Sequence, residues 1–166
     1  MADAVDAILE QWRRERPDLD TTPMGVVGRI SRLSRHFDRA IAENFAQFEL
    51  GPDEFDLLAT LRRSGKPYEL KPSELLATMM VSSATTTHRL DKLEKRDLIE
   101  RKPDPTDRRA VLVRLTPAGR KLVDRALAAH VALEHQLLAR LDGPQRSALA
   151  ELLRQLNEEV APAEYK

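Results

Sequence analysis

Apolar residues recur every three or four positions along most of the chain, a spacing that predicts amphipathic α-helices. A first helix is expected before Pro17, and a second from about Asp20 to Gly51. The apolar stripe of the second helix consists of Val27, Ile30, Leu33, Phe37, Ile41, Phe45 and Phe48. A shorter helix is expected from Pro52 to Ser64.

The middle of the chain predicts two short helices followed by a β-hairpin. One helix starts at Lys71–Glu74, a tight turn covers residues 81–83, and the next helix follows directly. Two short helices joined by such a turn form a helix-turn-helix unit. Runs of β-branched and leucine residues at Leu98–Arg101 and Val111–Leu115 then predict paired strands, with residues 103–109 as the tip.

The last part of the chain predicts a long helix from Thr116 to Leu141 and a final helix after Asp142–Pro144. The expected fold class is therefore mainly α with a small β-hairpin wing: a winged helix-turn-helix with N- and C-terminal dimerisation helices. The expected domains are residues 1–50 (an extra helix plus a dimerisation helix), 51–116 (the winged helix-turn-helix) and 117–166 (C-terminal dimerisation helices).

The helices at the two ends carry more apolar stripe than a helix-turn-helix can cover. A helix of this kind buries its stripe against something. We expect a second copy of the chain, because two DNA-reading helices one turn of DNA apart require a two-fold pair. The alternative is a self-contained monomeric bundle.

The helix that starts near Ser83 has the composition of a helix that reads a major groove. Leu90 and Leu93 are expected to point inward, which leaves small hydroxyls and Arg89 on the outer face. Arginine pairs with guanine through two hydrogen bonds. The residues expected to face DNA on this helix are Ser82, Ser83, Thr85, Thr86, Thr87, His88, Arg89 and Lys92. The alternative is a solvated, threonine-rich face.

The hairpin tip carries Arg108 and Arg109 beside Asp107. Arginine side chains on such a finger can enter a narrow minor groove, where the negative potential is strongest. We therefore expect both arginines to contact DNA. A solvated charged loop is the alternative.

Composition narrows the function further. The 166 residues include 27 basic and 27 acidic side chains, so a DNA-binding surface has to come from a local patch. Without cysteine, thiol chemistry and Cys-based zinc sites are excluded; a zinc sensor would need His and carboxylates from separate helices. No phosphate-binding loop or nucleophile motif is present, so we expect neither an enzyme nor a cofactor. The absence of a signal peptide or membrane span predicts a cytoplasmic protein with no membrane partner.

The segment Asp107–Thr116, DRRAVLVRLT, matches the DxRxxxVxLT wing signature of MarR-type winged-helix regulators at every fixed position. The preceding PSELLATMMVSSATTTHRLDKLEKRDLIER resembles the helix-turn-helix of that family, and TPAGRKL the start of its dimerisation helix. The resemblance covers residues 24–160. It implies a homodimer on pseudo-palindromic operator DNA, with Arg109 in the minor groove and Ser82–Arg89 in the major groove.

The N-terminal extension with its single tryptophan resembles the urate-responsive, PecS/HucR-like subfamily. The resemblance implies a ligand-responsive regulator, most often a repressor, that a small anionic or aromatic effector releases from DNA. The implied ligand-binding residues are Trp12, Asp56, Arg89 and Arg101.

The match to this subfamily is incomplete, because Leu19 stands in the region where some members use an asparagine. A polycarboxylate such as citrate or aconitate is therefore the alternative effector. Trp12 alternatively anchors the extra helix to the core. A winged-helix oligomerisation or adaptor protein without specific DNA binding is the alternative of a different class.

Overall fold

The computed structural model describes residues 2–78, 86–105 and 110–160. The elements in chain order are α1 (Ala4–Glu15), α2 (Thr22–Ala46), α3 (Pro52–Arg63), β1 (Glu69–Leu70), α4 (Pro72–Thr78), α5 (Thr86–Lys95), β2 (Ile99–Pro103), β3 (Val111–Leu115), α6 (Pro117–Leu137) and α7 (Gly143–Val160).

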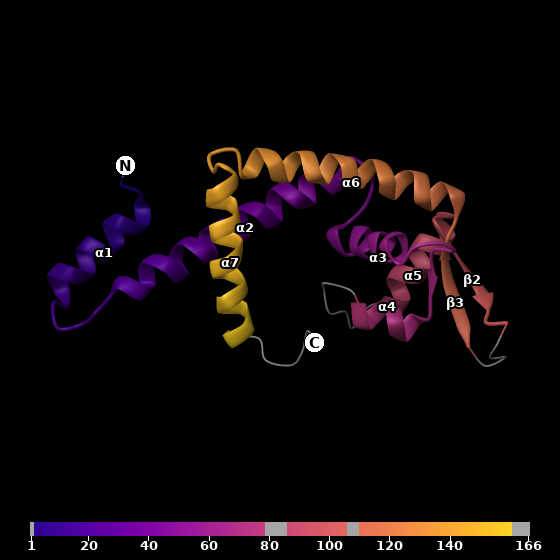
Figure 1. Ribbon diagram of the computed structural model, residues 1–166, viewed down its shortest axis with the longest axis horizontal. Coiled ribbons are helices and arrows are strands. Elements are labelled where there is room, and N and C mark those ends of the chain that lie inside the picture. Colours follow the sequence, from indigo (N-terminus) through magenta and orange to yellow (C-terminus); the bar gives the residue numbers. More distant parts are fainter. Residues whose placement is uncertain (1, 79–85, 106–109, 161–166) are drawn as a thin grey trace.

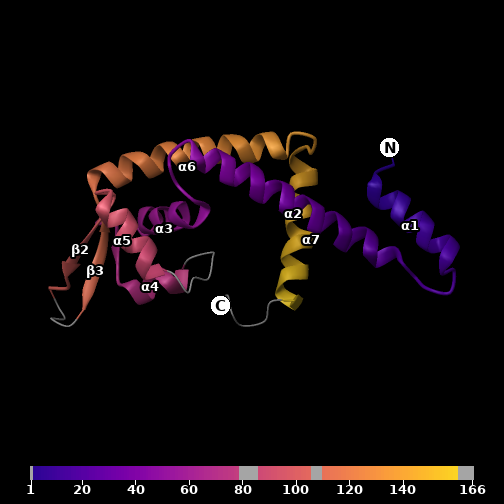
Figure 2. The same ribbon diagram turned by 180° about the vertical axis from the view of Figure 1, so that it is seen from behind.

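The elements form two regions joined by the long helices α2 and α6, which pack against each other (Figure 1). At one end α3, α4 and α5 lie under α6, with the sheet beside them. At the other end α1 packs on the N-terminal part of α2, and α7 crosses α2 at a steep angle. Both views place α1 far from α3, α5 and β2 (Figures 1 and 2). The expected mainly helical fold with a small β wing is confirmed.

The core lies in the winged-helix region. Leu57, Leu58 and Leu61 of α3 are fully buried, because they occupy positions that one helix face brings together. Leu90 and Leu93 of α5 are buried against the same cluster, as the sequence predicts. The inward face of α5 is therefore fixed, and so is the direction of its outer face.

The sheet has three antiparallel strands in the order β1-β3-β2. Ile99 pairs with Leu115 and Pro103 with Val111, so the predicted hairpin is confirmed, with β2 starting one residue later and ending two residues later than expected. The edge strand β1 was not predicted. Its two residues are too few to show an alternating pattern, and they become a strand only because β3 offers a free edge.

Two helices end earlier than the apolar pattern predicts. α2 ends at Ala46 rather than Gly51, because the chain turns at Glu49, whose φ is 56°, and returns Leu50 to the core. α6 ends at Leu137 rather than Leu141. In both cases the apolar pattern continues past the end of the helix. The turn after α2 buries Leu50, and the turn after α6 half-buries Leu141.

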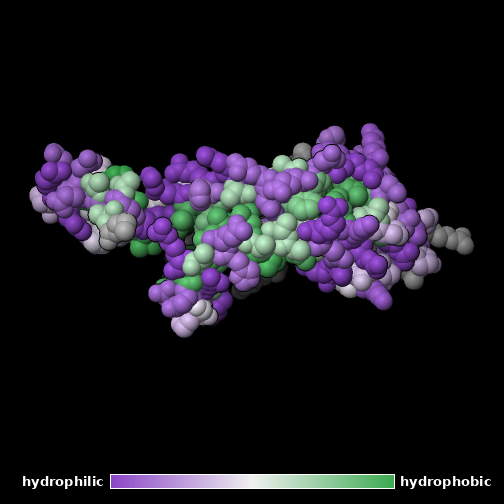
Figure 3. Space-filling view, turned by 90° about the horizontal axis from the view of Figure 1, so that it is seen from above, coloured by the Kyte–Doolittle hydropathy of each residue, from purple (hydrophilic) through white to green (hydrophobic). Residues whose placement is uncertain are grey.

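The apolar stripes at the far end are not covered. Seen from above, hydrophobic residues gather along the centre of the molecule over the long helices, and hydrophilic residues cover its edges (Figure 3). None of the side chains that the structure describes on α7 is buried. The exposed large apolar residues of these helices are Met24, Val26, Val27, Ile30 and Leu33 of α2, Leu127 and Val131 of α6, and Leu149, Leu152, Leu153 and Leu156 of α7.

Candidate nucleic-acid interface

The exposed end of α5 is the part of the predicted DNA-facing surface that the structure describes best. Thr87 and His88 are exposed in its first turn. Several predicted contacts lie outside the described residues, namely Ser82, Ser83, Thr85, Arg108, Arg109 and the side chain of Thr86.

Two predicted DNA contacts form ion pairs within the chain. Arg89 pairs with Asp53 at the start of α3, and Lys92 lies 2.7 Å from the Glu54 carboxylate. The Arg89 side chain is only 22% exposed. Its Nη1 is buried and has no hydrogen-bond partner among the residues that the structure describes. Both side chains thus tie α5 to α3 here, and their contact with DNA stays a prediction.

Glu54 is buried and serves two elements at once. Its carboxylate accepts a hydrogen bond from the Gly51 amide at 2.8 Å, which caps α3, and it binds Lys92 of α5. Burial raises the pKa of Glu54, but the hydrogen bonds from Lys92 and Gly51 lower it by more, so the pKa lies below the ordinary value. The charged form therefore holds α3 and α5 together.

Arg101 of β2 braces the other side of α5. Its guanidinium lies 2.6 Å from Asp91 and 2.5 Å from Glu94, and its amide donates to Glu94 at 3.1 Å. Burial lowers the pKa of Arg101, but these carboxylates raise it by more. Helix and hairpin are therefore tied directly to each other.

The base of the hairpin is also joined tightly to α6. The Thr116 hydroxyl donates to the Asp97 carbonyl at 2.6 Å and accepts from the Gly119 amide at 2.9 Å. A Cβ on Gly119 would lie 1.9 Å from the Leu98 carbonyl oxygen, so only glycine permits this close approach. The start of α6 is therefore held in direct contact with the base of the hairpin.

The predicted ligand residues do not come together in one chain. Trp12 is 41% exposed on α1, at the opposite end from the winged helix (Figure 1). Asp56 is buried on α3, where its carboxylate lies 3.6 Å from Arg63. The carboxylate that pairs with Arg89 is Asp53, one turn earlier on the same helix.

Sequence reasoning missed the roles of Asp53 and Glu54. The available signal was their place in the first turn of α3, three and two positions before Asp56. Over the described ranges 2–78, 86–105 and 110–160, no cluster of three or more His, Asp or Glu side chains could hold a metal ion. In the same ranges, no helix is both long and apolar enough to span a membrane.

A helix-turn-helix followed directly by a hairpin that is braced to its second helix defines the winged-helix class of DNA-binding proteins. The model of the MarR family matches residues 50–111. The transcriptional regulator PecS of Dickeya dadantii is 42% identical over 90% of this chain and 90% of its own length. The transcriptional repressor NicR of Pseudomonas putida is 30% identical over 83% of this chain and 88% of its own.

The fold agrees with these sequence relatives. The MarR-family regulator Sco3205 of Streptomyces coelicolor, solved in complex with DNA, superimposes with a TM-score of 0.76. The match covers 88% of this chain and 92% of that one at 23% identity. The chain belongs to the MarR family. It is a DNA-binding transcription regulator and not an enzyme.

Proposed function

We propose that the protein is a repressor that binds a pseudo-palindromic operator as a homodimer and is released by a small anionic effector such as urate. In this proposal residues 51–116 read DNA, while residues 1–50 and 117–166 hold the two copies together. The observation that carries it is the bracing of α5 to the hairpin by Arg101. A reading helix and a wing held as one unit can be placed on DNA together.

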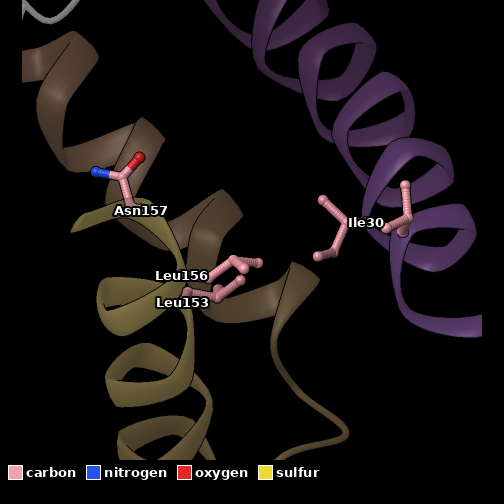
Figure 4. Close-up of a pocket in the computed structure, with 5 residues that line it drawn as sticks. Ile30, Leu153, Leu156 and Asn157 are labelled. Carbon is pink, nitrogen blue, oxygen red and sulfur yellow. The ribbon is translucent and has the colours of Figure 1, made fainter. Parts of the chain in front are cut away.

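The dimer is supported by the uncovered apolar faces. An apolar groove of about 530 Å³ lies between α2 and α7, lined by Val27, Ile30, Leu153, Leu156 and Asn157. Leu153 and Leu156 point across it toward Ile30 (Figure 4). Exposed apolar surface of this extent is typical of protein interfaces. A second copy offers a matching surface by symmetry.

The direct test of DNA binding is a gel-shift assay with the DNA upstream of the protein's own gene. We expect a shift that a scrambled duplex of equal length does not show. Binding should weaken steeply as salt rises, because bound basic side chains release counterions from the phosphates. Absence of any shift at low salt would favour the winged-helix adaptor protein instead. Repression itself is tested by expression of a reporter from this promoter with and without the protein.

In the proposed effector site, Trp12 has to come from the partner copy. In one chain α1 lies far from Asp56 and Arg101. A bound anion beside Asp56 would act on α3, and α3 is tied to the reading helix through Asp53 and Arg89. The effector would thus favour a state in which the reading helix is displaced, as linkage requires.

Trp12 is a built-in probe for this proposal, because it is the only tryptophan of the chain. Urate and citrate are titrated separately while its fluorescence and the gel shift are followed. Quenching and release by urate support the urate assignment, and release by citrate alone supports the polycarboxylate alternative. If neither compound changes either signal, both assignments fail and Trp12 is left with a structural role.

A further inference from the structure

An ion pair with a buried carboxylate joins the outer end of the wing to the start of the first helix of the helix-turn-helix. Lys71 lies between β1 and α4, and Asp104 directly follows β2. The Lys71 Nζ lies 3.2 Å from the Asp104 carboxylate. Because β3 lies between β1 and β2, the pair connects the two outer edges of the sheet.

The two partners of this pair differ strongly in burial. The Asp104 side chain is only 5% exposed, whereas that of Lys71 is 40% exposed. Burial of a carboxylate is costly unless it is paired and hydrogen-bonded. The Asp104 amide also donates to the Ala110 carbonyl at 3.0 Å, which closes the hairpin just below its tip. Asp104 is therefore fixed both to the tip-proximal backbone and to the start of α4.

We propose that Lys71 and Asp104 are positioning residues that set the angle of the wing relative to the helix-turn-helix, and thereby determine how the wing enters DNA. Arg101 braces the hairpin at its base, beside α5. Without a second fixed point the outer half of the hairpin could rotate about that base. The Lys71–Asp104 pair supplies this second point: Asp104 lies three positions beyond Arg101, just after β2, and Lys71 lies on the opposite edge of the sheet. The proposal rests on the DNA-binding function proposed above.

The sign of one substitution separates this role from simple electrostatics. Asp104→Asn removes a negative charge from the wing, so electrostatics alone predicts tighter binding to any DNA. The positioning role predicts the opposite: operator affinity falls about tenfold or more, while affinity for scrambled DNA does not fall. Lys71→Met should lower operator affinity to a similar extent. The operator affinity of the double variant should not be lower than that of the single variant with the lower affinity, because both substitutions remove the same contact.

The matched control is Glu100→Gln, which removes a carboxylate of β2 that is 41% exposed and pairs with Lys102 of the same strand. It should not weaken operator binding. Thermal unfolding of each variant checks that the fold is retained. Tighter or unchanged operator binding by Asp104→Asn would overturn the proposal. So would a Lys71→Met effect that persists in full in the Asp104→Asn background, because Lys71 would then act on phosphates.

A second measurement needs no DNA. The chain has no cysteine, so Leu76→Cys on α4 and Lys102→Cys on β2 place two unique spin labels at exposed positions. Adding Asp104→Asn should broaden the distance distribution between the labels, and an unchanged distribution would overturn the proposal. If the unaltered protein binds no upstream DNA, the proposed function fails, but this distance measurement still decides whether the pair fixes the wing.

Discussion

The winged-helix end and the α1–α7 end of this molecule differ in how completely each chain covers its own apolar surface. In α3 alone, seven residues are buried, and the sheet and α5 close over them. On α7 the leucine stripe is exposed, and on α2 only Gly25 and Phe45 are buried. The first region thus covers most of its apolar side chains within one chain. The second has the pattern of half an interface.

The ion pairs of the winged-helix region also differ from those of α7. At the winged-helix end, arginines and lysines are paired between elements, as in Arg89–Asp53, Arg101–Asp91 and Lys92–Glu54. On α7 the ion pairs of Arg154 with Glu151 and Glu158 stay within one exposed helix. Pairs between elements fix geometry, whereas exposed pairs within a helix contribute little. At the other end of the molecule Arg29 of α2 also pairs with Asp3 and Asp6 and so fixes α1, which leaves α7 as the contrasting element.

The largest effect is expected from a substitution that disrupts the exposed apolar surface of α2 and α7. Leu153→Glu places a charge in the α2–α7 groove and should dissociate the dimer. Loss of the two-site contact should lower operator affinity by about 10²–10⁴-fold. Sedimentation and gel shifts measure the two effects. Ser147→Glu, on the opposite face of α7, is the control and should change neither. A Leu153→Glu protein that remains dimeric would refute this interface.

A substitution in the core of the winged-helix region should lower the stability of the fold. Leu61→Ala removes a fully buried side chain and should lower the free energy of unfolding by about 2–5 kcal/mol. Urea unfolding at a concentration where the protein is monomeric measures it. Leu152→Ala, at a position that is 63% exposed, should have almost no effect under the same conditions. Equal losses for the two variants would remove the distinction between the regions.

Arg109→Ala tests the wing directly. If this side chain occupies the minor groove, operator binding should weaken by about 1–3 kcal/mol, the range of one good contact. Fluorescence anisotropy with a labelled operator gives the affinity. Arg140→Ala, an exposed position after α6 and away from the wing, serves as the control. Unchanged affinity of Arg109→Ala would assign that side chain to solvent.

The joint between the two regions is sensitive to a single methyl group. Gly119→Ala brings a Cβ against the Leu98 carbonyl, so we expect the free energy of unfolding to fall by about 1–3 kcal/mol. Gly143→Ala is the matched control, because no atom lies within 4 Å of the added Cβ. Thermal unfolding distinguishes them. If both variants melt like the unaltered protein, the contact of α6 with the hairpin is looser than described.

The smallest effect concerns the Glu54 ion pair. Because the pKa of Glu54 is lowered in the folded state, its charge stabilises the fold above the ordinary glutamate pKa of about 4.3. This stabilisation is lost as pH falls through the lower, folded value. Glu54→Gln should therefore cost about 1 kcal/mol near pH 7 and less in acid. Glu10→Gln, at a position on α1 whose side chain is 57% exposed, should show little change at any pH. If Glu54→Gln lowers the free energy of unfolding by the same amount at every pH, the charge of Glu54 does not stabilise the fold.

Most of the elements could be predicted from the sequence because their signals are local. The helical stripes, the start of α3 at Pro52 and the hairpin pairing all follow from residues close together in the chain. Arg89 and Asp56 were both selected for the candidate site, but the ion pair forms between Arg89 and Asp53. Carboxylates three positions apart lie on the same side of a helix, so spacing alone does not decide between them.

The sequence by itself determined the existence and order of the helices and of the β2–β3 hairpin, because periodicity and turn chemistry depend on near neighbours. Only the tertiary structure decided which apolar stripes are buried, which carboxylate each arginine binds and that β1 is a strand. It also decided that Lys71 and Asp104, 33 positions apart, form a pair across the sheet. These outcomes depend on distances between elements, and such distances are set by packing of the whole chain.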